Sequence, residues 1–425
     1  MEAAQSNDKD RDGGRIGNRA NDISGVMATG GEDSGAKAKA AGQAKWTFMV
    51  YMAGDNNLDG AALRDIAEMA RAGSTKDVNV LVQLDRIEDN LTRRFRITQG
   101  GGFKKNCIES FGEVNTGDPQ VLYDFVKWAA DNYPADRYAL ILWNHGSGWW
   151  EEAKSRATGP TGRKPRRHLF RHSFPQEHRS ICYDDTSGGD ALDNRELKGV
   201  LSQACALLGR KIDLLGMDAC LMNMVEVAYQ LRDSVNVIVG SEIEEPFDGW
   251  PYTVILARLT AKPGQDAVAL ARWIVKSYLL SYQGKDETLT QSALDVGRIG
   301  EMTTKVDAIS EALLAAIDAD FKLIEAAWRR SPRFYDNNYI DLACFIKNLR
   351  KKADTELQAK ADDLIAALKV GKGRAILRQG KIGREVRGTC GLSIYFPGDR
   401  INPTYRNLDF SGDCKWITFL ERYLS

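Results

Sequence analysis

Short apolar runs of strand length alternate with segments of helical periodicity along the first part of the chain. Apolar residues recur every three or four positions at residues 58–72, 118–128 and 193–208, which predicts helices there. The runs expected to form strands are residues 46–52, 78–84, 138–143, 212–217 and 235–239, with residues 93–98 as an edge strand or hairpin. This alternation predicts an α/β fold, in which helices cover both faces of a mostly parallel sheet.

Beyond residue 260 the pattern becomes mainly helical. Helices are expected at residues 266–280, 300–328, 339–349, 355–368 and 416–424, with one further apolar strand at residues 391–396. We therefore divide the chain into a disordered tail (1–44), a core (45–260) and a helix-rich C-terminal region (261–425). The periodicity leaves open whether the C-terminal region is a separate domain or a set of helices packed on the sheet.

Composition excludes several classes of function. The 425 residues are 43% hydrophobic, and acidic and basic side chains balance to a formal net charge of zero. Such a chain is not suited to general binding of nucleic acid or of an anionic membrane surface, and no apolar run is long enough to span a bilayer. The first 44 residues have few large apolar side chains and no apolar signal segment. Localisation stays open, with the cytoplasm favoured over export.

The seven cysteines are irregularly spaced and include no Cys-x-x-Cys pair, so they indicate neither a disulfide framework nor a zinc site. Cys220 differs from the others because it follows the apolar run 212–217 and precedes a segment, beginning at Leu221, with the spacing of a helix. A thiol on such a turn would lie at the carboxyl end of the sheet, where ligands bind, and the helix dipole would favour its thiolate. We therefore expect Cys220 to be a nucleophile.

A second apolar run, residues 138–143, leads in the same way into a turn that contains His145. Gly146 and Gly148 in this turn let the backbone come close to a substrate. If the strands before His145 and Cys220 are neighbours, the imidazole and the thiol face one crevice. That arrangement is suited to nucleophilic acyl transfer. The chain has four histidines in all, so few others compete for this role.

Three sequence blocks together resemble the clostripain family of cysteine peptidases, which belongs to the caspase-like group. The blocks are Trp46-Thr-Phe-Met-Val-Tyr-Met-Ala-Gly-Asp-Asn-Asn-Leu58, Ile141-Leu-Trp-Asn-His-Gly-Ser-Gly-Trp149 and Gly216-Met-Asp-Ala-Cys-Leu-Met222. The resemblance implies a caspase-like sheet and a cysteine endopeptidase acting on polypeptides with Arg or Lys before the cleaved bond. It also implies a dyad in which Cys220 attacks and His145 is the general acid and base. No third member can be identified.

The resemblance assigns further residues to the oxyanion and to the substrate side chain. The backbone N–H groups of Gly146 and Cys220 would bind the oxyanion that develops on the scissile carbonyl. Asp218 matches the acidic position beside the nucleophile in this family and would pair with the basic side chain of the substrate. Asp248, on the loop that leaves the next strand, is a second candidate. Either aspartate could instead only stabilise a turn.

Residues 151–180 interrupt the α/β pattern with eight lysine or arginine residues against three glutamates. This basic loop has almost no strand or helix periodicity. It is either a solvated insertion or, as the resemblance implies, a loop that a basic-specific peptidase cuts in itself. It also contains His168, His172 and His178, whose spacing lacks the cysteine or acidic partners of a known zinc motif.

Several acidic residues could belong either to a site or to a turn. Asp55 follows the first strand and could border the crevice, although a capping or turn-forming role suits it better. Asp184, Asp185 and Asp190 precede a capping box at Asp193 and lack the spacing of an EF-hand loop, which favours a solvated turn. Calcium is possible here because some clostripain relatives depend on it, but no cofactor is certain.

Two other classes of function are compatible with the fold alone. A non-catalytic caspase-like module could use the same crevice to hold a peptide or a partner, although the paired cysteine and histidine argue against it. A nucleotide-binding α/β protein would need a glycine-rich phosphate loop after the first strand. The sequence Ala53-Gly-Asp-Asn-Asn57 has neither the P-loop nor the dinucleotide pattern of glycines.

Overall fold

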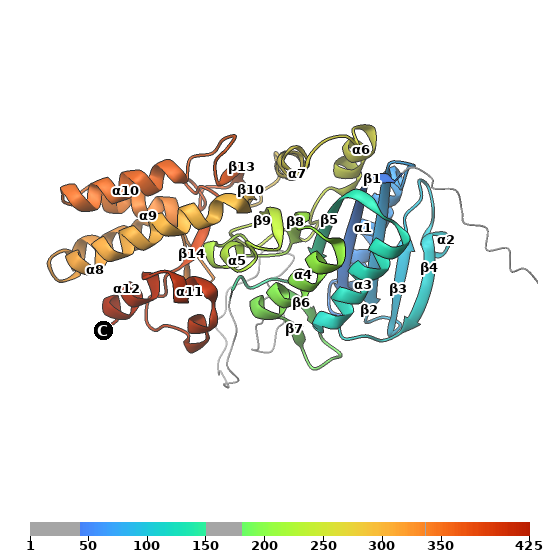
Figure 1. Cartoon of the computed structure of the whole chain (residues 1–425), viewed down its shortest axis with the longest axis horizontal. Coiled ribbons are helices and arrows are strands. Elements are labelled where there is room, and N and C mark those ends of the chain that lie inside the picture. Colours follow the sequence, from blue (N-terminus) through green and yellow to red (C-terminus); the bar gives the residue numbers. More distant parts are fainter. Residues whose placement is uncertain (1–42, 150–180, 336) are drawn as a thin grey trace, which may run out of the picture. The chain divides into compact units, whose positions relative to one another are not determined.

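The fold is built around a nine-stranded sheet. A computed structural model describes residues 43–149, 181–335 and 337–425, which belong to one compact unit. In spatial order the strands are β13 (Ile376–Ile382), β10 (Leu289–Asp295), β9 (Val235–Gly240), β8 (Ile212–Asp218), β5 (Ala135–Trp143), β1 (Ala44–Gly54), β2 (Val78–Arg86), β3 (Leu91–Arg96) and β4 (Cys107–Gly112) (Figure 1).

The central strands, from β9 to β2, are parallel, and antiparallel strands extend the sheet at both edges. The predicted α/β fold with a mostly parallel central sheet is therefore confirmed. Three strands of the sheet were not predicted: β4, β10 and β13. In β10 and β13 polar residues interrupt the apolar run, as in Leu289-Thr-Gln-Ser-Ala-Leu-Asp295, so neither segment has the pattern of a buried strand.

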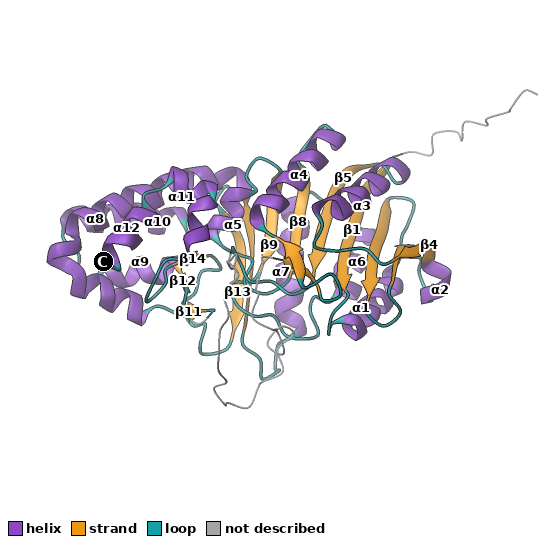
Figure 2. Cartoon of the chain, turned by 90° about the horizontal axis from the view of Figure 1, so that it is seen from below, coloured by secondary structure: helices purple, strands orange, loops and turns teal. Residues whose placement is uncertain are grey.

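Helices cover both faces of the sheet (Figure 2). On one face α1 (Asp59–Ala72) packs against α6 (Tyr252–Ala261), which contacts α7 (Ala267–Ser281). On the other face α3 (Pro119–Asn132) packs against α4 (Asn194–Leu208), next to α5 (Val225–Gln230). Because helices lie on both sides, the central strands are buried on both faces and read as continuous apolar runs.

The C-terminal region is built on α8 (Ile299–Arg330), which kinks at Asp320. Three helices pack against it: α9 (Leu342–Arg350), α10 (Thr355–Ala367) and α12 (Trp416–Tyr423). A small antiparallel sheet joins β11 (Arg333–Phe334), β12 (Tyr339–Asp341) and β14 (Ser393–Tyr395). The prediction of a helix from residue 339 is wrong at its start, because residues 339–341 pair with β14 as a strand.

Short elements complete the described chain: α2 (Phe103–Asn106), β6 (Ile181–Asp184), β7 (Asp190–Leu192), the 3-10 helices η1 (Val296–Arg298) and η2 (Pro403–Asn407), and α11 (Asp409–Asp413). No helix within these ranges has the length and apolar character needed to cross a membrane. Residues 1–42 of the predicted tail and the basic loop 151–180, with its three histidines, lie outside the described residues. The division at residue 260 stays a prediction.

Two glycines allow a matched test of the packing around β8. A Cβ atom added to Gly216 would lie 2.5 Å from Ile141 Cδ1 and 2.9 Å from Trp250 Cη2. Gly216→Ala should therefore lower the free energy of unfolding by about 1–3 kcal/mol through overpacking. Gly199, in α4, has open space around its Cα, and Gly199→Ala should raise stability by up to about 1 kcal/mol. Denaturant unfolding of both variants checks this, and equal effects would contradict the packing described for β8.

Candidate active site

The carboxyl ends of β5 and β8 lie side by side near the centre of the sheet. The two strands pair in parallel, with Trp143 opposite Asp218 as the last aligned residues. His145 and Cys220 each follow two positions after this pair, so the loops that carry them leave the same edge of the sheet as neighbours. A Cβ atom added to Gly146 would collide with the carbonyl oxygen of Cys220. The two loops are therefore in backbone contact, which requires glycine at this position.

Cys220 is buried, and its Sγ atom accepts a hydrogen bond from the backbone N–H of Glu245 at 3.2 Å. Burial raises the pKa of the Cys220 thiol well above its usual value, and the nearby Glu244 adds to the shift. The helix expected from Leu221 instead begins at Val225, since Leu221 adopts a left-handed φ of 66° that ends regular structure. The predicted effect of a helix dipole on Cys220 is therefore wrong.

His145 contacts a residue that the sequence pattern did not single out. Its Nε2 atom lies 2.7 Å from Oδ1 of Asn57, in the turn after β1. Because an amide oxygen only accepts hydrogen bonds, this contact assigns a proton to Nε2. The imidazole also meets the ring of Tyr183 edge-on. Asn57 is thus in a position to orient His145, a role for which the sequence had offered no candidate.

Asp218 lies beneath the loop that follows β9. Its carboxyl group is fully buried and accepts a hydrogen bond from the hydroxyl of Tyr252 at 2.7 Å. The Cα of Gly249 lies over this group, since a Cβ atom added there would be 3.3 Å from Asp218 Oδ1. Burial raises the pKa of Asp218 to about 7, although the hydrogen bond from Tyr252 acts in the opposite direction.

Glu245 forms a buried acidic pair with Asp218. Burial and the neighbouring Asp218 raise the pKa of Glu245 well above its usual range. Its Oε1 atom accepts a hydrogen bond from Nε2 of Gln291 at 3.1 Å. Within the described ranges no lysine or arginine forms an ion pair with either carboxyl group. A buried anion without a counter-ion is costly, so this pair is suited to receive a cation from outside the protein.

Asp248, the second predicted substrate-binding residue, has a different environment. Its side chain is 71% exposed and forms an ion pair with Lys285, whose Nζ atom is 3.3 Å away. Such exposed pairs contribute little to stability. The carboxylate of Asp248 therefore faces solvent, in contrast to the buried pair, and its role in substrate binding stays a prediction.

Polar residues of β10 hold the loop that contributes Glu245. Oγ1 of Thr290 accepts a hydrogen bond from the backbone N–H of Glu242 at 2.9 Å, and Gln291 donates to Glu245 as described above. These hydrogen bonds tie the loop after β9 to the buried polar side chains of β10. The hydrophobic pattern of the sequence indicated neither β10 nor a role for Glu245. The signal that could have found them is the run of three polar residues, 290–292, between apolar neighbours.

Comparisons with known proteins point to one family. A family model described as the clostripain family matches residues 50–423. Clostripain from Hathewaya histolytica is 31% identical over 251 residues, and this alignment covers 52% of the chain and 43% of the relative. The chain therefore aligns with less than half of that relative.

Solved structures share the fold. A secreted C11 cysteine protease from Bacteroides thetaiotaomicron, in complex with an irreversible peptide inhibitor, matches with a TM-score of 0.64 at 20% identity, over 89% of this chain and 99% of that one. An inactive zymogen C11 protease from Parabacteroides distasonis matches with a TM-score of 0.62 at 20% identity, over 88% and 99%. At this level of identity the likeness concerns the fold alone.

The raised pKa of Asp218 makes a prediction about stability and pH. Folded Asp218 titrates at about 7 instead of 3.8, so between these values the native state binds a proton that the unfolded chain releases. Stability contributed by the protonated group is present at low pH and is lost as pH rises from about 4 through 7. In a Cys220→Ala background, Asp218→Asn should raise the melting temperature at pH 8 by about 2–5 °C and have less effect at pH 5.

Thermal unfolding from pH 5 to pH 8 measures this difference. Asp248→Asn is the matched control, because the carboxylate that it removes is exposed. If the melting temperatures of Asp218→Asn and of the parent protein differ by the same amount at every pH from 5 to 8, the carboxyl group of Asp218 is not desolvated as described.

Proposed function

Because the chain belongs to the clostripain family of cysteine peptidases, we propose that it is an endopeptidase that hydrolyses peptide bonds after Arg or Lys. Cys220 is the nucleophile, and His145 is the general acid and base. The parallel pairing of β5 and β8 supports this assignment, since it brings both residues to one edge of the sheet. The substrates are polypeptides that present a basic side chain before the cleaved bond.

The observation that carries the specificity is the buried acidic pair of Asp218 and Glu245. Asp218 precedes Cys220 by two residues, and the backbone of Glu245 hydrogen-bonds the Cys220 thiol. A guanidinium or ammonium group inserted beside this pair would neutralise carboxyl groups that have no cationic partner in the described chain. An Arg or Lys side chain supplies such a group, whereas Leu or Asp does not.

The proposed reaction begins when the Cys220 thiol loses its proton to His145 and attacks the carbonyl carbon of the scissile bond. The new S–C bond leaves a negative charge on the carbonyl oxygen, which the N–H groups of Gly146 and Cys220 bind. His145 then donates its proton to the departing amine, and a thioester remains on Cys220. Water attacks this thioester while His145 accepts its proton, and the free carboxylic acid and the thiol are released. Asn57 holds the imidazole in position through this cycle.

We also propose that the chain cuts itself within the basic loop 151–180. Ile181, the first described residue after that loop, forms an isolated antiparallel bridge with Gly146, so the loop ends next to the residue proposed for the oxyanion site. The thiol of Cys220 is buried in this state. A cut within residues 151–180 would separate the rest of the loop from the anchored Ile181 and admit a substrate. One structural relative is described as an inactive zymogen, which is compatible with an uncut, inactive form of this fold.

A non-catalytic peptide-binding module is the alternative of a different class. It would use the same sheet edge and the same acidic pair to hold a basic peptide. It gives no reason, however, for a cysteine and a histidine on neighbouring strand ends. Turnover of a peptide distinguishes the two functions directly.

Fluorogenic peptides that differ only in the residue before the cleaved bond, Arg, Lys, Asp or Leu, test the proposed activity. The wild-type protein, after cleavage of its loop, should turn over the Arg and Lys peptides only. Cys220→Ala should abolish turnover, whereas Cys205→Ala, in α4 with its thiol bonded to the carbonyl of Ser234, should leave kcat/KM unchanged. Asp218→Asn should lower kcat/KM for the basic peptides by about 100-fold, because it removes the buried counter-charge. A preference that survives Asp218→Asn would move this role to Asp248.

Self-cutting is tested by the chain length of the purified protein. Wild-type protein should separate into two fragments whose new terminus, read by mass spectrometry, lies within residues 151–180 and follows Arg or Lys. Cys220→Ala protein should stay whole under the same conditions, and Cys205→Ala protein should be cut like the wild type. Wild-type protein that is active on peptides but remains a single chain would contradict this part of the proposal.

A further inference from the structure

A cavity lies in the C-terminal region between the end of α8, α9 and the segment that joins β13 to β14. The helices α8 and α9 pack against each other in this region (Figure 1). The volume of the cavity is about 580 Å³, which is in the usual range for small-molecule sites. Its described lining includes four cationic side chains and one acidic side chain: Arg330, Lys347, Lys351, Arg387 and Glu385. We call it the cationic cavity.

The four cations of this cavity differ from neighbouring cations on the same helices. Arg329 forms an ion pair with Glu325, and Arg350 forms one with Asp362. Among the residues that the structure describes, no carboxylate forms an ion pair with any of the four. Like charges gathered in one concave site attract anions from solution. The positive charge of the cavity is thus available to an anionic ligand.

Helix ends account for part of this charge, because cations near a helix C-terminus complement its dipole. Arg330 lies in the last turn of α8, and Lys347 lies in that of α9. Arg387, in contrast, lies on no helix but in a turn after β13, where its backbone N–H donates to the carbonyl of Arg384 at 3.2 Å. The dipole also gives no reason why two helix ends and this turn meet at one cavity.

Packing and hydrogen bonds hold the walls of the cavity. Nζ of Lys351 donates to Oδ1 of Asn348 at 3.0 Å, and Nδ2 of Asn348 donates to Oγ of Ser331 at 3.4 Å. A Cβ atom added to Gly388 would lie 3.4 Å from Sγ of Cys344, so the turn after β13 packs directly on α9. The cavity is therefore formed before any ligand binds, as most small-molecule sites are.

We propose that the cationic cavity binds a small molecule that carries two or more phosphate groups. The guanidinium groups of Arg330 and Arg387 are suited to paired hydrogen bonds with phosphate oxygens, and the two lysines add point charges. A phosphate monoester carries a charge of about −1.5 to −2 at neutral pH, so two such groups balance a lining with four cations and one acid. The described lining contains no aromatic ring, so recognition rests on the phosphates and not on a stacked base.

Binding at the cavity would reach the loop that contacts Cys220 by way of Asp341. The carboxylate of Asp341 accepts the backbone N–H of Cys344, which lines the cavity, at 2.6 Å, and that of Cys390 at 2.6 Å. The buried side chain of Glu242 lies next to that of Asp341, and the loop that begins there donates a backbone N–H to the Cys220 thiol. A ligand that holds α9 and the turn after β13 should thus stabilise this loop. This link to turnover rests on the proposed function, whereas the binding of the ligand does not.

Binding is measured on the full-length Cys220→Ala protein, with sodium tripolyphosphate as the probe and no divalent cation in the buffer. Calorimetric titration should show one site per chain whose affinity falls as NaCl is added, and the melting temperature should rise with the concentration of the probe. ATP, which adds a nucleoside to three phosphates, should bind no more tightly, and citrate should bind more weakly. Tighter binding of ATP or of citrate would overturn recognition through phosphates alone. No heat and no thermal shift with any of the three would overturn the site.

Lys347→Gln combined with Arg387→Gln is the diagnostic variant. Both side chains are exposed, so their replacement should not lower the melting temperature of the ligand-free protein. The dissociation constant for tripolyphosphate should rise about tenfold or more, because two charge-assisted contacts are lost. Arg329→Gln combined with Lys352→Gln removes the same charge from exposed positions outside the lining, and should change the constant less than about twofold. An equal loss of affinity in both variants would show general charge attraction only, and would overturn the site.

Turnover tests the link to the active site. With wild-type protein whose loop has been cut, tripolyphosphate should raise kcat/KM for the Arg peptide about twofold or more, with a half-maximal effect at the measured dissociation constant. The variant that combines Lys347→Gln with Arg387→Gln should turn over the peptide without this response. Binding with no change in kcat/KM would overturn the link but not the site. Wild-type protein that binds the probe but cleaves no peptide would contradict the proposed function alone.

Discussion

The parallel pairing of β5 with β8 is the constraint on which the candidate active site depends. Parallel strands end at the same edge of a sheet, and the register that aligns Trp143 with Asp218 puts His145 and Cys220 two residues beyond that aligned pair. Both strands are buried on both faces, so a slip in register would expose apolar side chains or disrupt the packing of the helices. The same hydrophobic core that stabilises the fold therefore determines which two loops touch.

Elements distant in sequence complete this edge. The polar strand β10 supports the loop of Glu245, and the C-terminal region supports the segment after Cys220. In that segment, Oε1 of Glu226 accepts hydrogen bonds from the backbone N–H of Tyr395 at 2.8 Å and from the hydroxyl of Tyr405 at 2.9 Å. Such buried hydrogen bonds join the segment after Cys220 to residues near the end of the chain and favour one arrangement of the loops. The position of the Cys220 loop is thus a property of the whole unit, including the C-terminal region.

The buried pair of Asp218 and Glu245 lies at this edge and has no cationic partner among the described residues. Such groups lower the stability of the folded chain unless a ligand compensates them. The proposed ligand of this pair is a basic side chain of the substrate, which would neutralise it transiently. Buried acids without a counter-charge lower the stability of the fold, and binding of a cationic group restores it. Destabilised groups of this kind are typical of functional sites.

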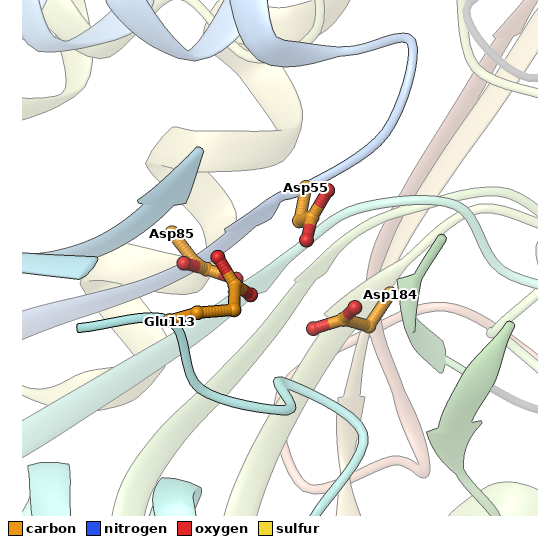
Figure 3. A group of neighbouring side chains, drawn as sticks. All are labelled: Asp55, Asp85, Glu113 and Asp184. Atoms are coloured by element: carbon orange, nitrogen blue, oxygen red, sulfur yellow. The ribbon is translucent and has the colours of Figure 1, made fainter. Parts of the chain in front are cut away.

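Hydrophobic periodicity determined the central strands, most of the covering helices and the α/β class, because buried parallel strands have continuous apolar runs. The position of Cys220 and His145 after two such runs, with the three blocks around them, also predicted the family. Tertiary structure alone decided the contact of Asn57 with His145 and the pairing of Glu245 with Asp218. It also brought together four acids from separate segments, Asp55, Asp85, Glu113 and Asp184 (Figure 3). These contacts join residues far apart in the chain, and no local pattern encodes them. The same holds for β10, whose polar residues Thr290 and Gln291 form hydrogen bonds with a loop far away in the chain.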